Sequence, residues 1–235
     1  MNEVRKRVEN IFAHAAALQQ NGRLKNTIYC LGDSVFIMNQ DHTVLMRCPL
    51  RRGEKTFEHP VSFMASDYDS NKFTEKDGRI VFIQKEGKYI RQKSCRTPDH
   101  SPKQVQKYYK DVVSSAKRCN KIVLDEDFIK LLDEELSHIE FKVEGGEFIC
   151  QQRNIYSGSV VTIKQQKSDG LLAAEPLKDF SSIGVRTNDF LALFSFVGSV
   201  AFYFVGKDVV LFESNEKAMP FTGIISQCVY DELGG

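Results

Sequence analysis

The sequence predicts an α+β fold built from two tandem domains, in which an antiparallel sheet backed by two helices occurs twice as a pseudo-two-fold repeat. The first observation is the run 199–228, where two apolar segments, Val200–Val205 and Val209–Phe212, flank a turn that contains glycine. Aromatic and β-branched residues on both sides of such a turn are typical of a β-hairpin. The second observation is a similar hairpin pattern at Arg79–Thr97, about half a chain earlier, which indicates an internal duplication.

The first domain is predicted to cover residues 1–101. It opens with an amphipathic helix at Asn2–Gln20, whose apolar residues recur every three or four positions before the helix-stopping pair Asn21-Gly22. Short turns then separate three strand-like segments, which implies an antiparallel meander. The elements expected after the helix are strands Asn26–Leu31, Ser34–Asn39 and Thr43–Cys48, a short strand Val61–Phe63, a weak helical turn Ala65–Lys72, and a hairpin Gly78–Arg96.

Residues 102–120 are predicted to form a basic helical connector, and residues 121–235 the second domain. Pro102 suits the first turn of a helix that runs to Lys117 with one apolar stripe. Helices in both domains are expected to pack on one face of their sheet. The elements expected in the second domain are strand Lys121–Leu124, helix Asp125–Ser137, strands His138–Val143, Glu147–Arg153 and Ser159–Gln165, strand Ile183–Val185, helix Asn188–Phe196 and the closing hairpin. In helix Asp125–Ser137 we expect Asp125 to be the N-cap, and the buried stripe to consist of Phe128, Leu131, Leu132 and Leu136.

Composition excludes several broad classes. The 235 residues are 42% hydrophobic and 27% charged, which is ordinary for a globular protein. The net charge is +1, so any attraction to nucleic acid must come from local patches. The longest apolar run, Phe190–Phe204, is too short and too interrupted to span a bilayer, and no signal core follows the basic N-terminus. We therefore expect a cytoplasmic protein without membrane contact.

No chemistry-bearing motif emerges from the chain. The six cysteines form no C-x-x-C pair and are predicted to be buried free thiols, the alternative being a disulfide framework or a zinc site. The five histidines show no ligand spacing, and P-loop, Rossmann, G-x-S-x-G and H-E-x-x-H patterns are absent. The acidic run Asp125–Asp127 fits a helix start better than a magnesium site, because adjacent helical residues do not face one another. We predict no enzyme activity, no catalytic residues, no metal and no cofactor.

A family resemblance rests on the meander and hairpin of each half. These are TIYCLGDSVFIMNQDHTVLMRC with GRIVFIQKEGKYIRQKSC, and IEFKVEGGEFICQQ with SVVTIKQQ and SVAFYFVGKDVVLFES. Two tandem domains with this order of elements resemble DNA polymerase sliding clamps, particularly the two-domain subunits of trimeric phage clamps. The resemblance implies two clamp-like domains per chain and a head-to-tail homotrimeric ring, with helices lining the hole and sheets that continue across subunit interfaces. The resemblance implies that this ring is a processivity factor, which encircles double-stranded DNA independently of its sequence and tethers a DNA polymerase, with a clamp loader as a further partner. If the protein is viral, we expect it in the host cytoplasm.

The resemblance also implies two sets of binding residues. Lysine and arginine suit a hole through which DNA slides, because their long side chains contact phosphates without reading bases. Ordinary solvated faces, and tyrosines that pack on the core, are the plainer alternatives. The candidate DNA contacts are Arg5, Lys6, Arg7, Arg23 and Lys25 around the first helix, and Lys103, Lys107, Lys110, Lys117 and Arg118 in the connector. The candidates for docking a partner peptide are Tyr108, Tyr109, Val229, Tyr230 and Leu233.

One feature departs from the family pattern: the helix expected at Asp125–Ser137 is acidic, although by analogy it lines the hole. Its carboxylates could point away from the DNA, pair with a basic segment of a neighbouring subunit, or mark a failure of the ring analogy; we favour pairing at an interface. The alternative functions are a monomeric clamp-like processivity factor, a β-rich viral structural protein, and an enzyme with an unrecognised site. The acidic residues are Asp125, Glu126, Asp127, Asp133, Glu134 and Glu135, against the single base Lys130.

Overall fold

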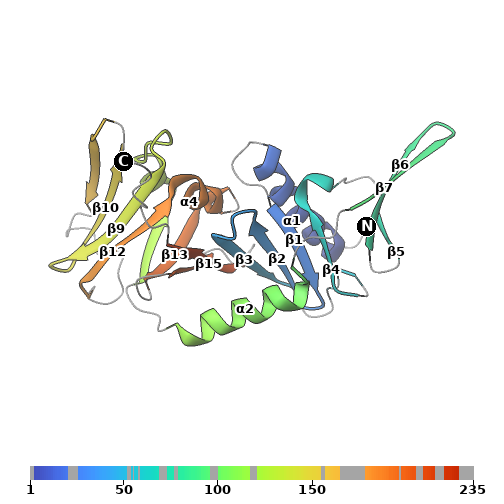
Figure 1. The fold of residues 1–235 in the computed structure, drawn as a ribbon, viewed down its shortest axis with the longest axis horizontal. Helices are drawn as coiled ribbons and strands as arrows, with labels where there is room; N and C mark the ends of the chain where they lie inside the picture. Colours follow the sequence, from blue (N-terminus) through green and yellow to red (C-terminus); the bar gives the residue numbers. More distant parts are fainter. Residues whose placement is uncertain are drawn as a thin grey trace, which may run out of the picture. The chain divides into compact units, whose positions relative to one another are not determined.

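The computed structural model of the chain divides into two compact units, Met1–Val112 and Val113–Gly235. Both units are rich in antiparallel sheet, with helices packed on the strands (Figure 1). The predicted domain limits 1–101 and 121–235, with a connector at 102–120, stay a prediction. The residues that the structure describes are 3–20, 26–51, 54, 56–57, 59–68, 73–76, 79–95, 100–116, 121–154, 157–164, 178–195, 197–204, 209–214 and 220–227.

The first unit opens with a helix and continues as two antiparallel sheets. The first sheet has the strand order β4-β1-β2-β3, and the second has the order β5-β6-β7. Between the two sheets lies η1, a single turn of 3-10 helix. The elements are α1 (Glu3–Gln20), β1 (Asn26–Leu31), β2 (Ser34–Asn39), β3 (Val44–Pro49), β4 (Val61–Met64), η1 (Ala65–Asp67), β5 (Phe73–Lys76), β6 (Arg79–Glu86), β7 (Tyr89–Ser94) and α2 (Pro102–Ser115).

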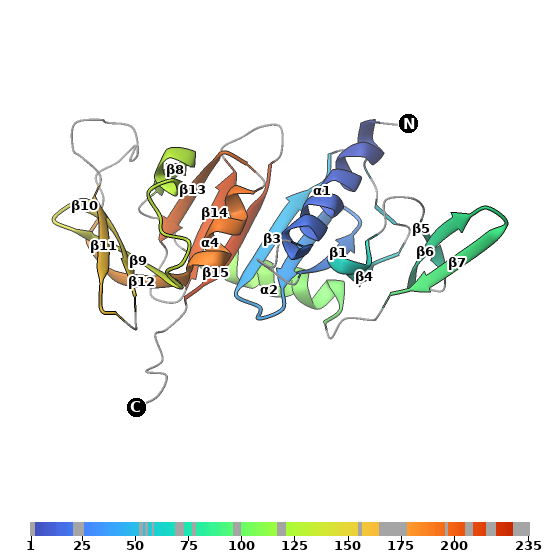
Figure 2. The ribbon, with the colours of Figure 1, turned by 90° about the horizontal axis from the view of Figure 1, so that it is seen from above.

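The first sheet of this unit is covered by a helix on each face. Phe12 of α1 packs edge-on against Phe63 of β4, with ring centroids 5.3 Å apart, and the strand register places Ile37 of β2 on the same face as Phe63. Phe36 precedes Ile37 and therefore points to the other face, where its ring lies 5.7 Å from Tyr109 of α2. Figure 2 shows α1 and α2 on opposite sides of these strands. The helix of the predicted connector therefore covers the face of this sheet opposite α1.

The second unit also holds two antiparallel sheets. Their strand orders are β12-β9-β10-β11 and β15-β14-β13-β8. Two short helices interrupt the strands in the described part of this unit. The elements are β8 (Lys121–Asp125), α3 (Glu126–Ile129), β9 (His138–Glu144), β10 (Glu147–Arg153), β11 (Val160–Lys164), β12 (Phe180–Arg186), α4 (Thr187–Phe194), β13 (Ser199–Phe204), β14 (Val209–Ser214) and β15 (Thr222–Ser226).

The two units repeat one topology, which confirms the predicted fold class. In each unit the fourth strand of a sheet returns beside the first, giving β4-β1-β2-β3 and β12-β9-β10-β11. A short helix, η1 or α4, then leads to a three-strand meander, β5-β6-β7 or β13-β14-β15. By this order hairpin β6–β7 corresponds to β14–β15, so the sequence comparison that equated it with β13–β14 is wrong by one strand. The missing strand is β5, whose sequence FTEK lacks an apolar run.

Each unit is closed by aromatic side chains that join its helices to its sheets. In the first unit Phe12 also contacts Tyr68 at 5.6 Å, and Tyr68 contacts Phe82 of β6 at 6.2 Å. In the second unit Phe190 of α4 lies 5.2 Å from Phe141 of β9 and 5.0 Å from Phe202 of β13. These rings are buried or half-buried, and burial of apolar surface of this kind is the dominant favourable term in folding.

Most of the predicted elements are confirmed within a residue or two at their ends, including strands β1 to β3, strands β9 to β11 and both hairpins. The helix expected at Asp125–Ser137 is wrong beyond its first turn. Helix α3 ends at Ile129, residues 130–137 form turns, and Leu131, expected to be buried, is 58% exposed. The helix does not continue because the Asp133 backbone N–H and carbonyl bond to the Gln152 side chain rather than along the helix.

Candidate nucleic-acid interface

Helix α1 is the element that carries the N-terminal basic cluster. Arg5, Lys6 and Arg7 lie in its first two turns, and their side chains lie outside the part of the chain that the structure describes, as do Arg23 and Lys25 altogether. The helix is fixed to the sheet by a buried stripe that includes Ile11, Phe12 and Ala15. The Nδ2 of buried Asn26 donates a hydrogen bond of 3.2 Å to the Ala15 carbonyl. Where it is described, the exposed face carries no lysine, arginine or acidic residue; it consists of Asn10, Ala13, His14 and Ala17.

Helix α2 carries the second basic cluster as a regular stripe. Its start is a capping box, in which the Ser101 N–H donates to Gln104 Oε1 at 2.8 Å and the Gln104 N–H donates to Ser101 Oγ at 3.4 Å. Lys103, Lys107 and Lys110 are spaced four and three residues apart, so they share one side of the helix, and all three are exposed. Lys117 and Arg118 lie outside the described residues.

The two basic clusters lie on opposite faces of one sheet. Helix α1 packs through Phe12 against the face of Phe63, and α2 packs through Tyr109 against the face of Phe36. A rigid duplex lying on one face therefore reaches the residues of α1 or those of α2, but not both. Sequence reasoning grouped the clusters as one kind of contact, because charge counts carry no information about which face of a sheet a helix covers.

The structure separates the two tyrosines proposed for docking a partner peptide. Tyr109 is only 6% exposed and packs on Phe36, whereas Tyr108 is 47% exposed on the outer side of α2. The packing alternative therefore holds for Tyr109. The other three candidates, Val229, Tyr230 and Leu233, lie outside the described residues.

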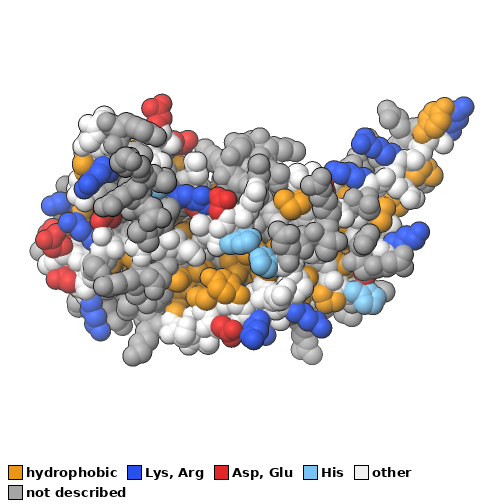
Figure 3. Space-filling model, viewed as in Figure 1, with side chains coloured by type: hydrophobic (Ala, Val, Ile, Leu, Met, Phe, Trp, Pro, Cys, Tyr) orange, Lys and Arg blue, Asp and Glu red, His pale blue; other side chains and the backbone are white. Residues whose placement is uncertain are grey.

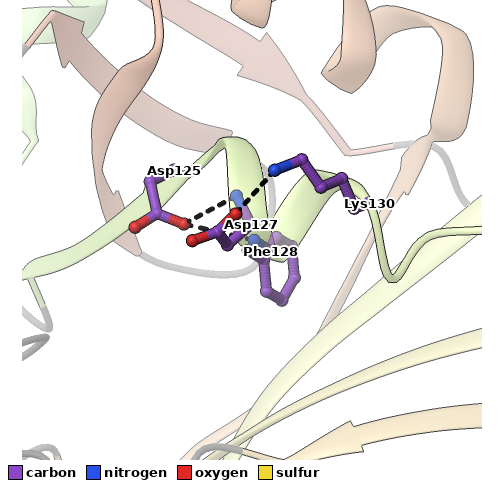
Figure 4. Close-up of polar contacts among 4 residues, drawn as sticks. All are labelled: Asp125, Asp127, Phe128 and Lys130. Atoms are coloured by element: carbon purple, nitrogen blue, oxygen red, sulfur yellow. Dashed lines mark hydrogen bonds and ion pairs between the residues drawn. The ribbon is translucent and has the colours of Figure 1, made fainter.

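Helix α3 opens with a well-formed cap. The Asp125 Oδ1 accepts hydrogen bonds from the backbone N–H groups of Asp127 and Phe128, each 3.1 Å long, so the predicted N-cap is confirmed (Figure 4). Lys130 Nζ lies 2.7 Å from Asp127 Oδ1, and this hydrogen bond lowers the pKa of the Asp127 carboxyl. Phe128 faces inward, 6.5 Å from Phe148 and 6.4 Å from Phe190.

A buried glutamine holds the turns that follow α3. Gln152 of β10 is fully buried; its Oε1 accepts from the Asp133 N–H at 2.8 Å, and its Nε2 donates to the Asp133 carbonyl at 2.9 Å. Asp133 Oδ1 in turn accepts from the Glu135 N–H at 2.9 Å. Gln152 and Phe148 are four residues apart in one strand and so point to the same face. The acidic segment 133–135 therefore lies on the same side of the sheet as α3.

Two strand edges carry most of the exposed large hydrophobic side chains among the described residues. Tyr89 and Ile90 of β7 are 70% and 59% exposed, and Val160 and Val161 of β11 are 47% and 38% exposed. Among the described residues, β7 pairs only with β6, and β11 pairs only with β10. In Figure 3 the β6–β7 hairpin presents hydrophobic side chains beside lysine and arginine. Unpaired strand edges with apolar side chains are ready templates for pairing with another strand.

The described residues show no candidate metal site and include four buried cysteines. No group of three or more histidine, cysteine, aspartate or glutamate side chains there could hold a metal ion. Cys30, Cys48, Cys95 and Cys150 are buried free thiols as predicted, and burial raises the pKa of Cys95 and of Cys150 to about 12, so neither forms a thiolate nucleophile at neutral pH. None of the described helices combines the length and the apolar character needed to cross a membrane.

Comparison with solved structures identifies the fold. The chain is similar to a chain of the PCNA2–PCNA3 complex from Sulfolobus tokodaii, with a TM-score of 0.53 and 13% identity over 92% of this chain and 95% of that one. It also matches proliferating cellular nuclear antigen from Entamoeba histolytica, with a TM-score of 0.49 and 12% identity over 91% and 94% of the two chains. No family model and no curated protein matches the sequence. At such low identity the first likeness concerns the fold, and it shows that this chain has a sliding-clamp fold over nearly its whole length.

Proposed function

We propose that this protein is a sliding clamp, a non-enzymatic processivity factor that encircles duplex DNA and holds a DNA polymerase on it. The observation that carries the proposal is the repeated topology: two units, each with a helix-covered sheet followed by a short helix and a three-strand meander, in a chain with the clamp fold. A ring made of such units needs no reactive group, and the described residues contain no candidate metal cluster.

Ring formation would use the two exposed strand edges. Strand β7 lies in the first unit and β11 in the second, so pairing β7 of one copy with β11 of the next is a head-to-tail contact. Contacts of this type close into a ring when the rotation between copies divides a full turn. Closure would cover Tyr89, Ile90, Val160 and Val161, which single chains expose. We propose three copies per ring, hence six units around the hole.

The DNA would lie on the α1 side of the first unit. Arg5, Lys6 and Arg7 on that helix are then the phosphate contacts. The lysines of α2 belong to the other face of the sheet, together with the exposed ring of Tyr108. That face is available to protein partners, which for this function are a DNA polymerase and a clamp loader.

The ring model is tested by the native mass of the protein and of edge variants. Light scattering should give three times the mass of one chain for the unmodified protein. Ile90→Lys on β7 and Val160→Lys on β11 should each reduce the mass toward that of a single chain, because lysine on a strand edge opposes pairing. Tyr108→Lys is the matched control, since it also replaces an exposed hydrophobic residue but lies on α2.

A native mass of one chain for the unmodified protein would favour the monomeric clamp-like alternative. Processive extension of primed DNA by a polymerase from the same organism, with and without the protein, separates both clamp models from a structural component. Equal product lengths with and without the protein would contradict the proposed function.

A further inference from the structure

Helices α1 and α3 occupy corresponding positions in the two units. Each precedes the first strand of a four-stranded sheet with the same strand order. Helix α1 packs inward through Phe12, which contacts Phe63. Helix α3 packs inward through Phe128, which contacts Phe148 and Phe190. If α1 faces the DNA, the topology therefore places α3 on the corresponding face of the second unit.

The charges on these two helices are opposite. Helix α1 begins with Arg5, Lys6 and Arg7. Helix α3 begins with exposed Glu126 and Asp127, and the segment 133–135, held over the same side by Gln152, is also exposed. Carboxylates of this kind are ionised at neutral pH. Lys130 is the single base among residues 125–135, and it pairs with Asp127.

We propose that the α3 face of the second unit repels the DNA phosphates, so that the duplex is held by the first unit alone. This inference rests on the proposed function. The acidic face, defined as residues 125–127 and 133–135, then reduces the number of phosphates bound per subunit. Fewer simultaneous contacts weaken binding and lessen its salt dependence, which suits a ring that must move along DNA.

The direct test is a charge reversal that adds positive charge to the acidic face. The double variant Glu134→Lys, Glu135→Lys changes two exposed side chains in a turn, so it leaves the core intact. Binding to a random-sequence duplex is measured by fluorescence anisotropy from 50 to 300 mM NaCl. We expect affinity at low salt to rise roughly tenfold and the slope of log Kobs against log salt to steepen by up to about 2 for each subunit that contacts the duplex, since each new phosphate contact adds about 0.9.

The sheet itself supplies a matched control. Glu140 and Glu144 alternate along β9 with the inward-facing residues Phe141 and Val143, so they lie on the face away from α3. The variant Glu140→Lys, Glu144→Lys adds the same charge on that other face. We expect it to change affinity and slope much less than the reversal on the acidic face.

The outcomes separate this inference from the proposed function. Tighter binding of the first variant with unchanged oligomer mass supports the repulsion. Equal effects of both variants, or no effect of either, would overturn it while leaving DNA binding intact. A fall in oligomer mass for the Glu134→Lys, Glu135→Lys variant would overturn it in favour of an interface between copies. An unmodified protein that binds no duplex at low salt would overturn the proposed function as well.

Discussion

Strands β2 and β9 belong to sheets with the same strand order in the two units, but the two sheets differ in how many of their faces are packed against other elements. All six residues of β2, SVFIMN, are buried, because α1 and α2 cover both faces of its sheet. In β9, HIEFKVE, buried residues alternate with partly exposed ones, as in a sheet with one packed face and one wet face. The number of covered faces, rather than the strand order, therefore sets the hydrophobic pattern of each strand.

Among the changes that test this difference between the sheets, truncation of Phe36 should have the largest effect on stability. Phe36→Ala removes a fully buried ring beneath α2, and we expect it to lower the free energy of unfolding by about 3–5 kcal/mol. Lys142→Ala, on the uncovered face of β9, should change it by less than about 0.5 kcal/mol. Urea unfolding of both variants measures the difference. Similar losses for the two would mean that α2 does not cover its sheet.

The anchor of the acidic turns should give the next largest effect. Gln152→Leu removes both side-chain hydrogen bonds to the Asp133 backbone, of which the carbonyl still accepts from the Leu136 N–H, and we expect a loss of roughly 1–3 kcal/mol. Proteolysis should also become faster within 130–137. Gln151→Leu is the neighbouring control, because the Gln151 side chain makes an exposed bond of 3.4 Å to Thr162. Unchanged proteolysis of the Gln152 variant would contradict the anchoring role.

Loss of the α3 cap should cost less. Asp125→Ala removes the oxygen that accepts from the Asp127 and Phe128 N–H groups, and we expect a loss of about 1 kcal/mol. Asp125→Asn should retain most of the stability, since asparagine caps as well as aspartate. An alanine variant as stable as the asparagine variant would show that this single-turn helix does not depend on its cap.

The smallest expected effect is a pH dependence at His138. Burial, and then the positive charge of Arg186, lower the pKa of His138 below its ordinary value of 6.5. Between that lowered pKa and 6.5 the unfolded chain binds a proton that the folded chain does not, so stability falls as the pH drops through this window. His138→Gln should make the thermal midpoint less sensitive to pH there. An unchanged pH dependence would assign the effect to other groups.

Most of the strands could be predicted from the sequence, because each of them is a short apolar or alternating run bounded by turn residues. Strand β5 was not, since its stability comes from pairing with β6 rather than from its own residues, FTEK. The early end of α3 depends on Gln152, a residue of a later strand whose side chain captures the Asp133 backbone. No sequence pattern near Asp133 predicts this contact with Gln152. The basic residues of the candidate site could be identified from their charge. Their placement on two faces of the sheet could be seen only from the positions of Phe36 and Phe63 in the structure.

Topological retention on DNA tests the central claim most directly. The protein is mixed with a linear duplex biotinylated at both ends, and both ends are then closed by binding to streptavidin beads. The beads are washed at about 1 M salt, where exposed charges more than about 3 Å apart are screened. An encircling ring should remain on this DNA, and it should be absent from DNA whose ends were closed before the protein was added. Release of all protein by the salt wash would contradict encirclement and leave only an electrostatic contact.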